Sequence, residues 1–268
     1  MLPKLGILAG GGALPRRLID HCRATDRAFF VVAIEGQCDA STVVDAPHVW
    51  CRLGAAGSLL AALRQAKASD IVLVGRVRRP SIGALRPDLR GIAILAQLGA
   101  NFFGGDDRLL RGIAGVLERQ GFRVLGVHQI LSDLVAPHGV LGRVRPDAQA
   151  ERDIACGTAA ARDLGRRDIG QAVIVRNEAV VDREDAAGTD ALIRRNAGQG
   201  GVLVKMKKPQ QDMRMDLPAI GLDTVRLAAQ AGLAGIAVEA GGALIVDRVD
   251  AVRAADEAGL FVMGTDGR

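Results

Sequence analysis

The residues best suited to chemistry lie between positions 205 and 224, in the sequence KMKKPQQDMRMDLPAIGLDT. Three lysines and an arginine alternate here with three aspartates, in a chain otherwise rich in small apolar residues. Cations can neutralise phosphate oxygens, while carboxylates can bind a metal ion or orient a water molecule. This composition favours phosphate chemistry, although a solvated loop with a few ion pairs explains the charges equally well.

Three residues of this charged segment, residues 205–224, have informative spacing. Asp212 and Arg214 are two apart, so they share one face if the chain is extended there. Such a pair serves either as a structural ion pair or as a phosphate-and-metal pair. Asp223 lies at the start of a helix predicted at 222–231, where a carboxylate also stabilises the helix dipole.

A second candidate site is the turn formed by Gly10, Gly11 and Gly12, between a predicted strand and a predicted helix. Glycines let backbone amides approach a phosphate, and the start of a helix favours negative charge. The sequence GGGALP is close to G-x-G-x-x-G, but Pro15 replaces the third glycine, which argues against a standard NAD site. Glu35 ends the next strand, where an acid can bind a ribose. A tight turn without a ligand explains the same residues.

Two further helix starts carry polar residues. Asp106 and Asp107 precede one helix, and Thr189 and Asp190 open another. Helix capping explains both pairs. The two aspartates could also reach a metal or a sugar hydroxyl, and the Thr189 hydroxyl with the free amides around it could hold a phosphate.

The first half of the chain alternates strand and helix. Apolar runs predict strands at 4–9, 29–35, 48–51, 70–77 and 123–130. Helical spacing occurs at 14–23, 57–68, 92–98 and 107–120. We therefore expect a Rossmann-like parallel sheet, covered by helices on both faces, in an N-terminal domain of residues 1–131.

Periodicity fades between positions 132 and 146, which we interpret as a linker because it holds two prolines and two glycines. The second half begins with a helix at 148–164 and a hairpin at 171–182. Further strands and helices then mix without strict alternation. We predict a mixed α/β catalytic domain at 147–268.

Composition narrows the class of partner. The formal net charge of +5 and pI near 9.4 favour acidic partners, such as phosphorylated metabolites or an anionic inner leaflet. Only 3% of the residues are aromatic, which argues against nucleic acid because stacking needs aromatic rings. No apolar run reaches the ~20 residues of a membrane span, and no signal peptide is recognisable. We expect a cytoplasmic protein.

Several reaction types lack support in the sequence. The four cysteines have no zinc spacing, and no G-x-S-x-G motif indicates a serine nucleophile. Attack by a metal-assisted water in a single step is therefore the simplest hydrolytic chemistry.

A series of short blocks spans nearly the whole chain: LAGGGALP, GRVRRP, GDDRLLRGIAGVLERQGFRVLGVHQI, DLVAPHGVLG, DIGQAVIV, GTDALIRR, KPQQDMRMDLPAIGLDTV and GLAGIAVEAG. In this order they resemble the LpxI family of UDP-2,3-diacylglucosamine pyrophosphatases. In that family the acid of the G-x-D-T block is essential, and Asp223 holds its place. Met215 stands where phenylalanine is usual, and the segment at 196–201 is short.

The resemblance implies an α/β enzyme that hydrolyses the diphosphate of UDP-2,3-diacylglucosamine in lipid A synthesis and requires Mg²⁺. Water would attack the sugar-side phosphorus to give UMP and 2,3-diacylglucosamine 1-phosphate (lipid X). The two domains would close around the substrate, a homodimer is expected, and peripheral contact with the inner membrane would suit a lipid substrate.

The implied roles divide the candidate residues into groups. Asp223 would bind Mg²⁺ or orient the attacking water, and Asp212 would help to hold the metal. The groups that would contact the substrate are Lys205, Lys208 and Arg214 for phosphate charge, Gln171, Thr189 and Asp190 for phosphate or glucosamine hydroxyls, and the glycine turn for UDP. Two alternatives remain open: an NAD(P)-dependent oxidoreductase that uses the glycine turn, and a carrier of lipids or nucleotide sugars without chemistry.

Overall fold

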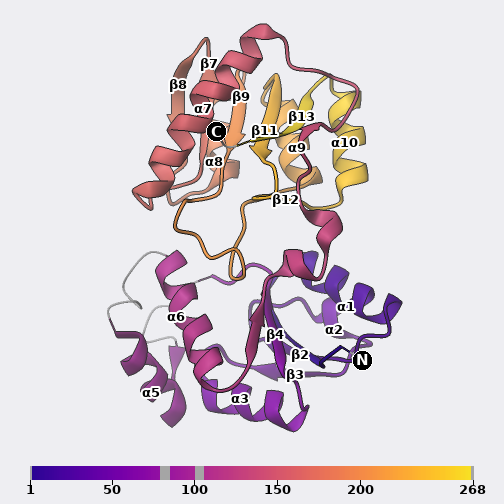
Figure 1. The fold of residues 1–268 in the computed structure, drawn as a ribbon, viewed down its shortest axis with the longest axis vertical. Helices are drawn as coiled ribbons and strands as arrows, with labels where there is room; N and C mark the ends of the chain where they lie inside the picture. Colours follow the sequence, from indigo (N-terminus) through magenta and orange to yellow (C-terminus); the bar gives the residue numbers. More distant parts are fainter. Residues whose placement is uncertain (1, 79–84, 100–105, 267–268) are drawn as a thin grey trace. The chain divides into compact units, whose positions relative to one another are not determined.

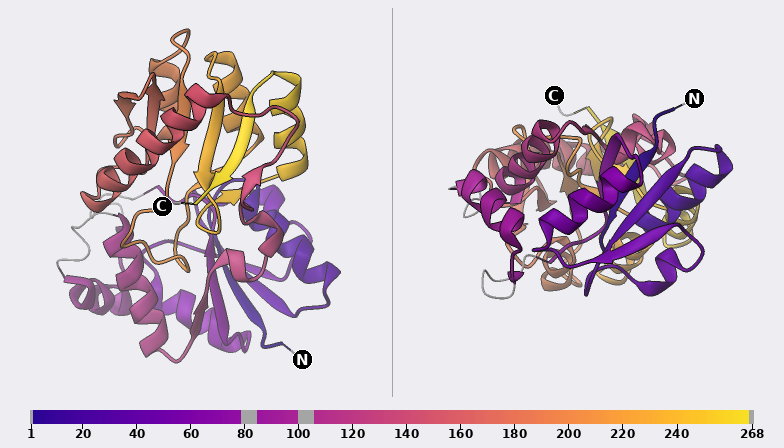
Figure 2. Two further views of the ribbon diagram at one scale, coloured as in Figure 1. Left: turned by 45° about the horizontal axis from the view of Figure 1, so that its top comes forward. Right: turned by 90° about the horizontal axis from the view of Figure 1, so that it is seen from below.

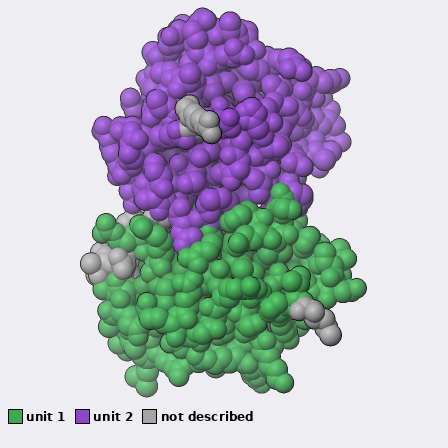
Figure 3. Space-filling model, in the orientation of Figure 1, with its two compact units in different colours: residues 1–132, 214–216 green, residues 133–213, 217–268 purple. Residues whose placement is uncertain are grey.

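The computed structural model describes residues 2–78, 85–99 and 106–266. The chain divides into two compact units, distinguished by colour in Figure 3. Unit 1 comprises residues 1–132 and 214–216, and unit 2 comprises residues 133–213 and 217–268. Each unit has its own sheet and its own apolar core, so each is described separately.

Unit 1 is built on a five-stranded sheet in the order β3-β2-β1-β4-β5, with all strands parallel (Figure 1). Its strands are β1 (Leu5–Ala9), β2 (Phe29–Ile34), β3 (His48–Cys51), β4 (Asp70–Val74) and β5 (Arg123–Leu125). The inner strands are continuous apolar runs, such as LGILA in β1, because both faces of the sheet are buried. The strand order reverses between β1 and β4, the point at which open parallel sheets bind ligands.

Five helices and two short turns of 3₁₀ helix complete the described part of unit 1: α1 (Leu14–Ala24), α2 (Ala40–Val43), α3 (Ala56–Gln65), α5 (Leu89–Leu98), α6 (Asp106–Arg119), η2 (Val127–Gln129) and η3 (Ser132–Leu134), the last extending into unit 2. Pro15 lies in the first turn of α1, where its fixed φ suits a helix start. Leu63 of α3 and Leu117 of α6 pack together over Ile71 of the sheet. The sheet and its helices are Rossmann-like, as predicted.

Unit 2 contains a mixed six-stranded sheet in the order β6-β13-β11-β9-β7-β8. Its strands are β6 (Gly139–Val140), β7 (Ala172–Arg176), β8 (Ala179–Arg183), β9 (Val202–Lys205), β11 (Gly235–Glu239) and β13 (Phe261–Thr265). The strands β9, β11 and β13 are parallel, and β7 and β8 form the predicted hairpin. A separate two-stranded parallel sheet joins β10 (Ala219–Ile220) to β12 (Leu244–Ile245).

Helices cover both faces of the unit 2 sheet (Figures 1 and 2). They are α7 (Ala148–Arg166), α8 (Thr189–Arg195), α9 (Leu222–Gln230) and α10 (Arg248–Glu257). Side chains alternate along each strand, so Leu203 of β9 joins the core with α8, α9 and α10, while Val204 joins the core with α7. The predicted mixed α/β fold of the second half is confirmed.

The charged segment returns to unit 1 for three residues, 214–216. Met215 is 7% exposed and belongs to the same apolar core as Ile71 and Leu117. Burial of this thioether contributes roughly 2 kcal/mol to anchoring the segment. The chain therefore passes between the units at positions 132, 213 and 216. No local sequence pattern predicts the second and third passages.

Residues 132–146, expected to form a linker, include η3 and β6. Gly139–Val140 pairs with β13 at the edge of the unit 2 sheet. All four cysteines are free thiols, and no helix within the described ranges is long and apolar enough to cross a bilayer.

Candidate functional site

The parallel strands of unit 2 bring two charged side chains to one edge of the sheet. β9 ends at Lys205, and the neighbouring strand β11 ends at Glu239. Ligands of α/β sheets bind outside the carboxyl ends of parallel strands. A ligand site of unit 2 is therefore expected at this edge.

A buried polar network surrounds Lys205, which is only 7% exposed. Its Nζ atom donates to Thr189 Oγ1 at 3.0 Å and to the Ala219 carbonyl at 3.2 Å. The Thr189 hydroxyl donates in turn to Glu184 Oε1. The other carboxylate oxygen, Glu184 Oε2, accepts from the backbone amide of Gln171 at 2.8 Å. Three predicted site residues thus lie in one network: Gln171 just before β7, Thr189 at the start of α8 and Lys205 at the end of β9.

The side chain of Gln171, whose backbone amide joins the network, has one atom without a partner. The side-chain oxygen Oε1 of Gln171 is buried and accepts no hydrogen bond from any described residue. A buried acceptor without a donor costs about 1–3 kcal/mol, so such atoms are rare in folded proteins. A ligand hydroxyl or amide would satisfy it.

Asp223 lies in the first turn of α9 and is exposed. Its carboxylate has no partner among the described side chains and amides, and Gly221 provides no side-chain cap for the helix. Lys205 is tied to the same region, because its ammonium holds the carbonyl of Ala219, four residues before Asp223. The network and the exposed carboxylate are therefore connected through β10.

The start of α8 differs from the expectation of a side-chain cap. Gly188 is the N-cap residue, and Thr189 is the first residue of the helix, with its hydroxyl directed into the network rather than onto helix amides. Asp190 is exposed in the first turn.

The structure gives Lys208 a partner outside the network. Its ammonium forms an ion pair with Asp168 at 2.7 Å, just after α7. Gln210 donates to the carbonyl of Gly165 at 2.7 Å in the same area. These contacts fasten the middle of the charged segment to the end of α7.

The chain is not extended through Asp212 and Arg214, so the condition under which they would share one face is not met. Residues 213–215 form a turn, because Met215 is drawn into the core of unit 1. Arg214 belongs to unit 1, where it pairs with Glu118 at 2.6 Å, whereas Asp212 belongs to unit 2. The two side chains therefore do not form one face of a strand.

In unit 1 the glycine turn packs against the end of β4. The amides of Gly10 and Gly11 donate to the carbonyls of Val74 and Arg76, both at 2.9 Å. A Cβ on Gly10 would lie 2.5 Å from the Arg76 oxygen, so close approach of the two loops requires glycine. The amide of Gly12 instead faces a carboxylate oxygen of Asp39 at 3.4 Å, where an anion is already accommodated.

Asp106 and Asp107 begin α6, but their side chains lie outside the described part of the structure.

The fit of Mg²⁺ depends on the carboxylates available. Within residues 2–78, 85–99 and 106–266, no group of three His, Cys, Asp or Glu side chains could hold a metal. Mg²⁺ is commonly bound by one or two carboxylates together with substrate phosphates and water. The exposed carboxylate of Asp223, with no competing partner, fits that kind of site.

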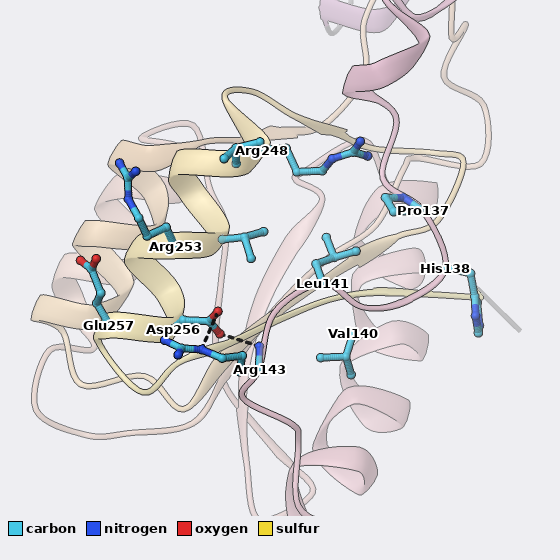
Figure 4. A pocket seen from close by; sticks show the side chains of 11 residues that line it. Pro137, His138, Val140, Leu141, Arg143, Arg248, Arg253, Asp256 and Glu257 are labelled. Carbon is cyan, nitrogen blue, oxygen red and sulfur yellow. Dashed lines mark hydrogen bonds and ion pairs between the residues drawn. The ribbon is translucent and has the colours of Figure 1, made fainter.

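The larger of two pockets described in unit 2 lies elsewhere, between residues 137–143 and α10 (Figure 4). Its volume is about 830 Å³, and none of the predicted site residues lines it. Asp256 in its wall accepts hydrogen bonds from the backbone amides of Arg143 and Val144, which lower the pKa of its carboxyl group. The Asp256 carboxylate also pairs with the Arg143 side chain at 3.4 Å.

Sequence reasoning missed two acids of the network and its surroundings. Glu184 follows β8 and has no sequence signal, since burial of a glutamate depends on tertiary packing. Glu239 does have one, because it ends an apolar strand at the edge where ligands bind. Its Oε2 atom accepts from the Lys207 amide at 2.9 Å, so it positions the chain directly after Lys205.

Comparison with known proteins agrees with this organisation. The model of the LpxI N-terminal domain matches residues 4–134, and that of the LpxI C-terminal domain matches residues 137–263. The UDP-2,3-diacylglucosamine pyrophosphatase LpxI of Caulobacter vibrioides is 42% identical over 274 residues, which cover 98% of each protein. The predicted family, and with it the expectation of an enzyme, is confirmed: this chain belongs to the LpxI family.

Proposed function

We propose that the protein hydrolyses the diphosphate of UDP-2,3-diacylglucosamine in lipid A synthesis, as the name of its Caulobacter relative indicates. The observation that carries the proposal is the exposed carboxylate of Asp223 at the start of α9, four residues after Ala219, whose carbonyl accepts from the buried ammonium of Lys205. Phosphoryl transfer needs both a group that orients water or binds metal and fixed positive charge.

In the proposed reaction, the oxygen of a water molecule bonds to the phosphorus that carries the glucosamine. The bond from that phosphorus to the oxygen bridging the two phosphates breaks, and the bridging oxygen leaves with UMP. The water oxygen becomes part of 2,3-diacylglucosamine 1-phosphate, and the released proton passes to solvent. No covalent enzyme intermediate is required.

The residues have the following proposed roles. Asp223 binds Mg²⁺ or orients the attacking water, and Asp212 assists in holding the ion. The positive charge of Lys205 stabilises the charge on the phosphate oxygens, while Gln171 Oε1 accepts a hydroxyl of the glucosamine. The remaining proposed contacts are Lys208, Arg214, Thr189 and Asp190 for phosphate and sugar, and the Gly12 amide for UDP, whose phosphate would replace the Asp39 carboxylate there.

Mg²⁺ would supply Lewis-acid stabilisation of the negative charge on the diphosphate. The chain's own share of the work is to fix Lys205 and Thr189 in place, so that no rearrangement is needed when the substrate binds. We also propose a cytoplasmic homodimer that works at the membrane surface where its substrate resides.

The test is hydrolysis of UDP-2,3-diacylglucosamine in ¹⁸O-labelled water with and without Mg²⁺, followed by mass spectrometry of both products. We expect the label in 2,3-diacylglucosamine 1-phosphate. Label in UMP would contradict the attack on the sugar-side phosphorus, and absence of UMP would favour a carrier.

A pair of variants tests Asp223 itself. Asp223→Ala is expected to lower kcat by about 10³-fold or more, since the group acts in the transition state. Asp250→Ala is the matched control, because Asp250 also lies in the first turn of a helix of unit 2. Equal activity in the two variants, with both folded by circular dichroism, would exclude the role of Asp223.

A further inference from the structure

The helix α5 has an outer face that no described part of unit 1 covers. Its inner face packs on the core of unit 1 through Gly91, Ile94 and Leu98. On the outer face, Leu89 is 88% exposed and Ile92 is 54% exposed. Ala93 and Ala96 are also exposed, which completes the spacing i, i+3, i+4, i+7 of one helical stripe. We call this stripe the α5 face; Figure 1 shows α5 at the rim of unit 1.

The α5 face is held firmly in position. Asp88 caps α5, with Oδ1 accepting from the Gly91 amide at 2.6 Å. Its other oxygen accepts from the amide of Gly57 in α3 at 2.9 Å. A Cβ on Gly91 would lie 2.4 Å from the carbonyl oxygen of Gly54, so the helix approaches the loop before α3 closely. The apolar residues are thus displayed by a fixed element.

The charges beside the α5 face are cationic. Asp88 precedes the helix, and both of its carboxylate oxygens accept hydrogen bonds from backbone amides. Arg86 and Arg90 are exposed, and neither forms an ion pair or hydrogen bond within the described ranges. Unit 1 as a whole is basic: residues 1–132 hold 17 Lys and Arg against 10 Asp and Glu, whereas residues 133–268 hold 18 against 20.

We propose that the α5 face docks on an anionic phospholipid surface, with Leu89 and Ile92 entering the interface and Arg86 and Arg90 contacting headgroups. Apolar side chains flanked by arginines provide the two signals that reversible membrane binding requires. A second copy of this chain would place like charges opposite each other, which favours the lipid. The inference rests on the proposed function, since a diacyl substrate resides in such a surface.

The test is co-sedimentation of the full chain with vesicles of phosphatidylethanolamine and phosphatidylglycerol that contain no substrate. Leu89→Glu combined with Ile92→Glu is expected to weaken binding roughly tenfold or more, because apolar burial is lost. Arg86→Gln combined with Arg90→Gln is expected to weaken it about tenfold and to reduce its salt dependence. Val44→Glu is the matched control, since Val44 is 77% exposed on another helix end of unit 1.

The outcomes separate this proposal from the proposed function. All of these variants should hydrolyse detergent-dispersed substrate at the wild-type rate. Vesicle binding is measured without substrate, so a protein that fails to hydrolyse the substrate would contradict the proposed function but not the docking proposal. The proposal is overturned by a wild-type protein that does not sediment with the vesicles, or by a Leu89→Glu, Ile92→Glu protein that sediments as well as wild type. It is also overturned if that variant halves the molar mass in light scattering, because the α5 face is then an interface between copies.

Discussion

Each unit of this protein buries a charged group at one edge of its sheet, and the two groups differ in their hydrogen-bonding partners. In unit 1, Asp70 begins β4, at the amino-terminal edge of the sheet, and accepts from Arg27 at 2.6 Å and from Arg123 at 2.7 and 2.8 Å. In unit 2, Lys205 ends β9, at the carboxyl-terminal edge, and donates to a hydroxyl and a carbonyl.

The difference lies in how the neighbouring polar atoms are satisfied. Both oxygens of Asp70 are held by guanidinium groups, which raises the pKa of Arg123 through the hydrogen bond to Asp70. Around Lys205, the hydrogen bonds lead through Thr189 and Glu184 to the backbone amide of Gln171, and the buried side-chain Oε1 of Gln171 has no donor among the described residues. A closed cluster stabilises a fold, whereas one with an unmet acceptor is suited to a ligand.

Among the changes that compare the two sheet edges, loss of the Lys205 charge should give the largest effect. Lys205→Met keeps the length of the side chain but removes the ammonium, so kcat for UMP release is expected to fall about 10²- to 10³-fold. The free energy of unfolding should change by about 1 kcal/mol or less. Lys207→Met is the matched control, because Lys207 lies in the same segment and its ammonium donates to the carbonyl of Lys208. Equal losses in both variants would mean that burial at Lys205 has no special role.

The Asp70 cluster should show the opposite pattern. Asp70→Asn leaves Arg27 buried without its counter-ion, so the free energy of unfolding in urea should fall by about 3 kcal/mol. The kcat per folded molecule should be unchanged. A variant with normal stability and reduced kcat would contradict the claim that the Asp70 cluster stabilises the fold without a role in activity.

Glu184 should have a smaller, positioning effect. Glu184→Gln keeps the shape of the side chain but replaces one acceptor with a donor, which disturbs either Thr189 or the Gln171 amide. We expect kcat to fall about tenfold with KM nearly unchanged, since orientation rather than binding is lost. Glu178→Gln, in the exposed hairpin turn, is the control. A fall in melting temperature without a change in kcat would identify Glu184 as purely structural.

How far the sequence could predict these features depends on how local their causes are. The strands of unit 1 are uninterrupted apolar runs, so their parallel sheet follows from the alternation with helices. The positions of Asp223 and of the carboxyl end of β9 could also be predicted, because the start of a helix and the end of a strand are local sequence patterns.

Other features arise only on folding. Lys205 and Lys208 lie in one short segment, yet one ammonium enters a network and the other pairs with Asp168. Burial of Met215 accompanies the return of the chain to unit 1. A single apolar residue in a charged loop does not predict that return. Burial of Glu184 needs the hairpin, α8 and β9 together. Contacts between residues far apart in the sequence therefore determine these features, which local sequence patterns do not predict.

The smallest effect concerns the support of α8, the helix that carries Thr189. Burial raises the pKa of Asp182, but hydrogen bonds from Arg195, Asn196 and the Arg183 amide outweigh it, so the folded pKa is below the ordinary value. The ionised carboxylate therefore contributes stability that is fully present above the unfolded pKa of about 3.9. This contribution is lost as the pH falls through the lower, folded pKa.

Asp182→Asn lacks this carboxylate, so at pH 7 its free energy of unfolding should be about 1 kcal/mol below wild type. In urea titrations at decreasing pH, the gap between the two proteins should hold down to about pH 5 and then close progressively below about pH 4. A gap that stays constant down to pH 3 would show that neutral hydrogen bonds, not the charge, hold β8 to α8. In that case the support of Thr189 would not depend on pH, and any loss of activity in acid would have to come from the site itself.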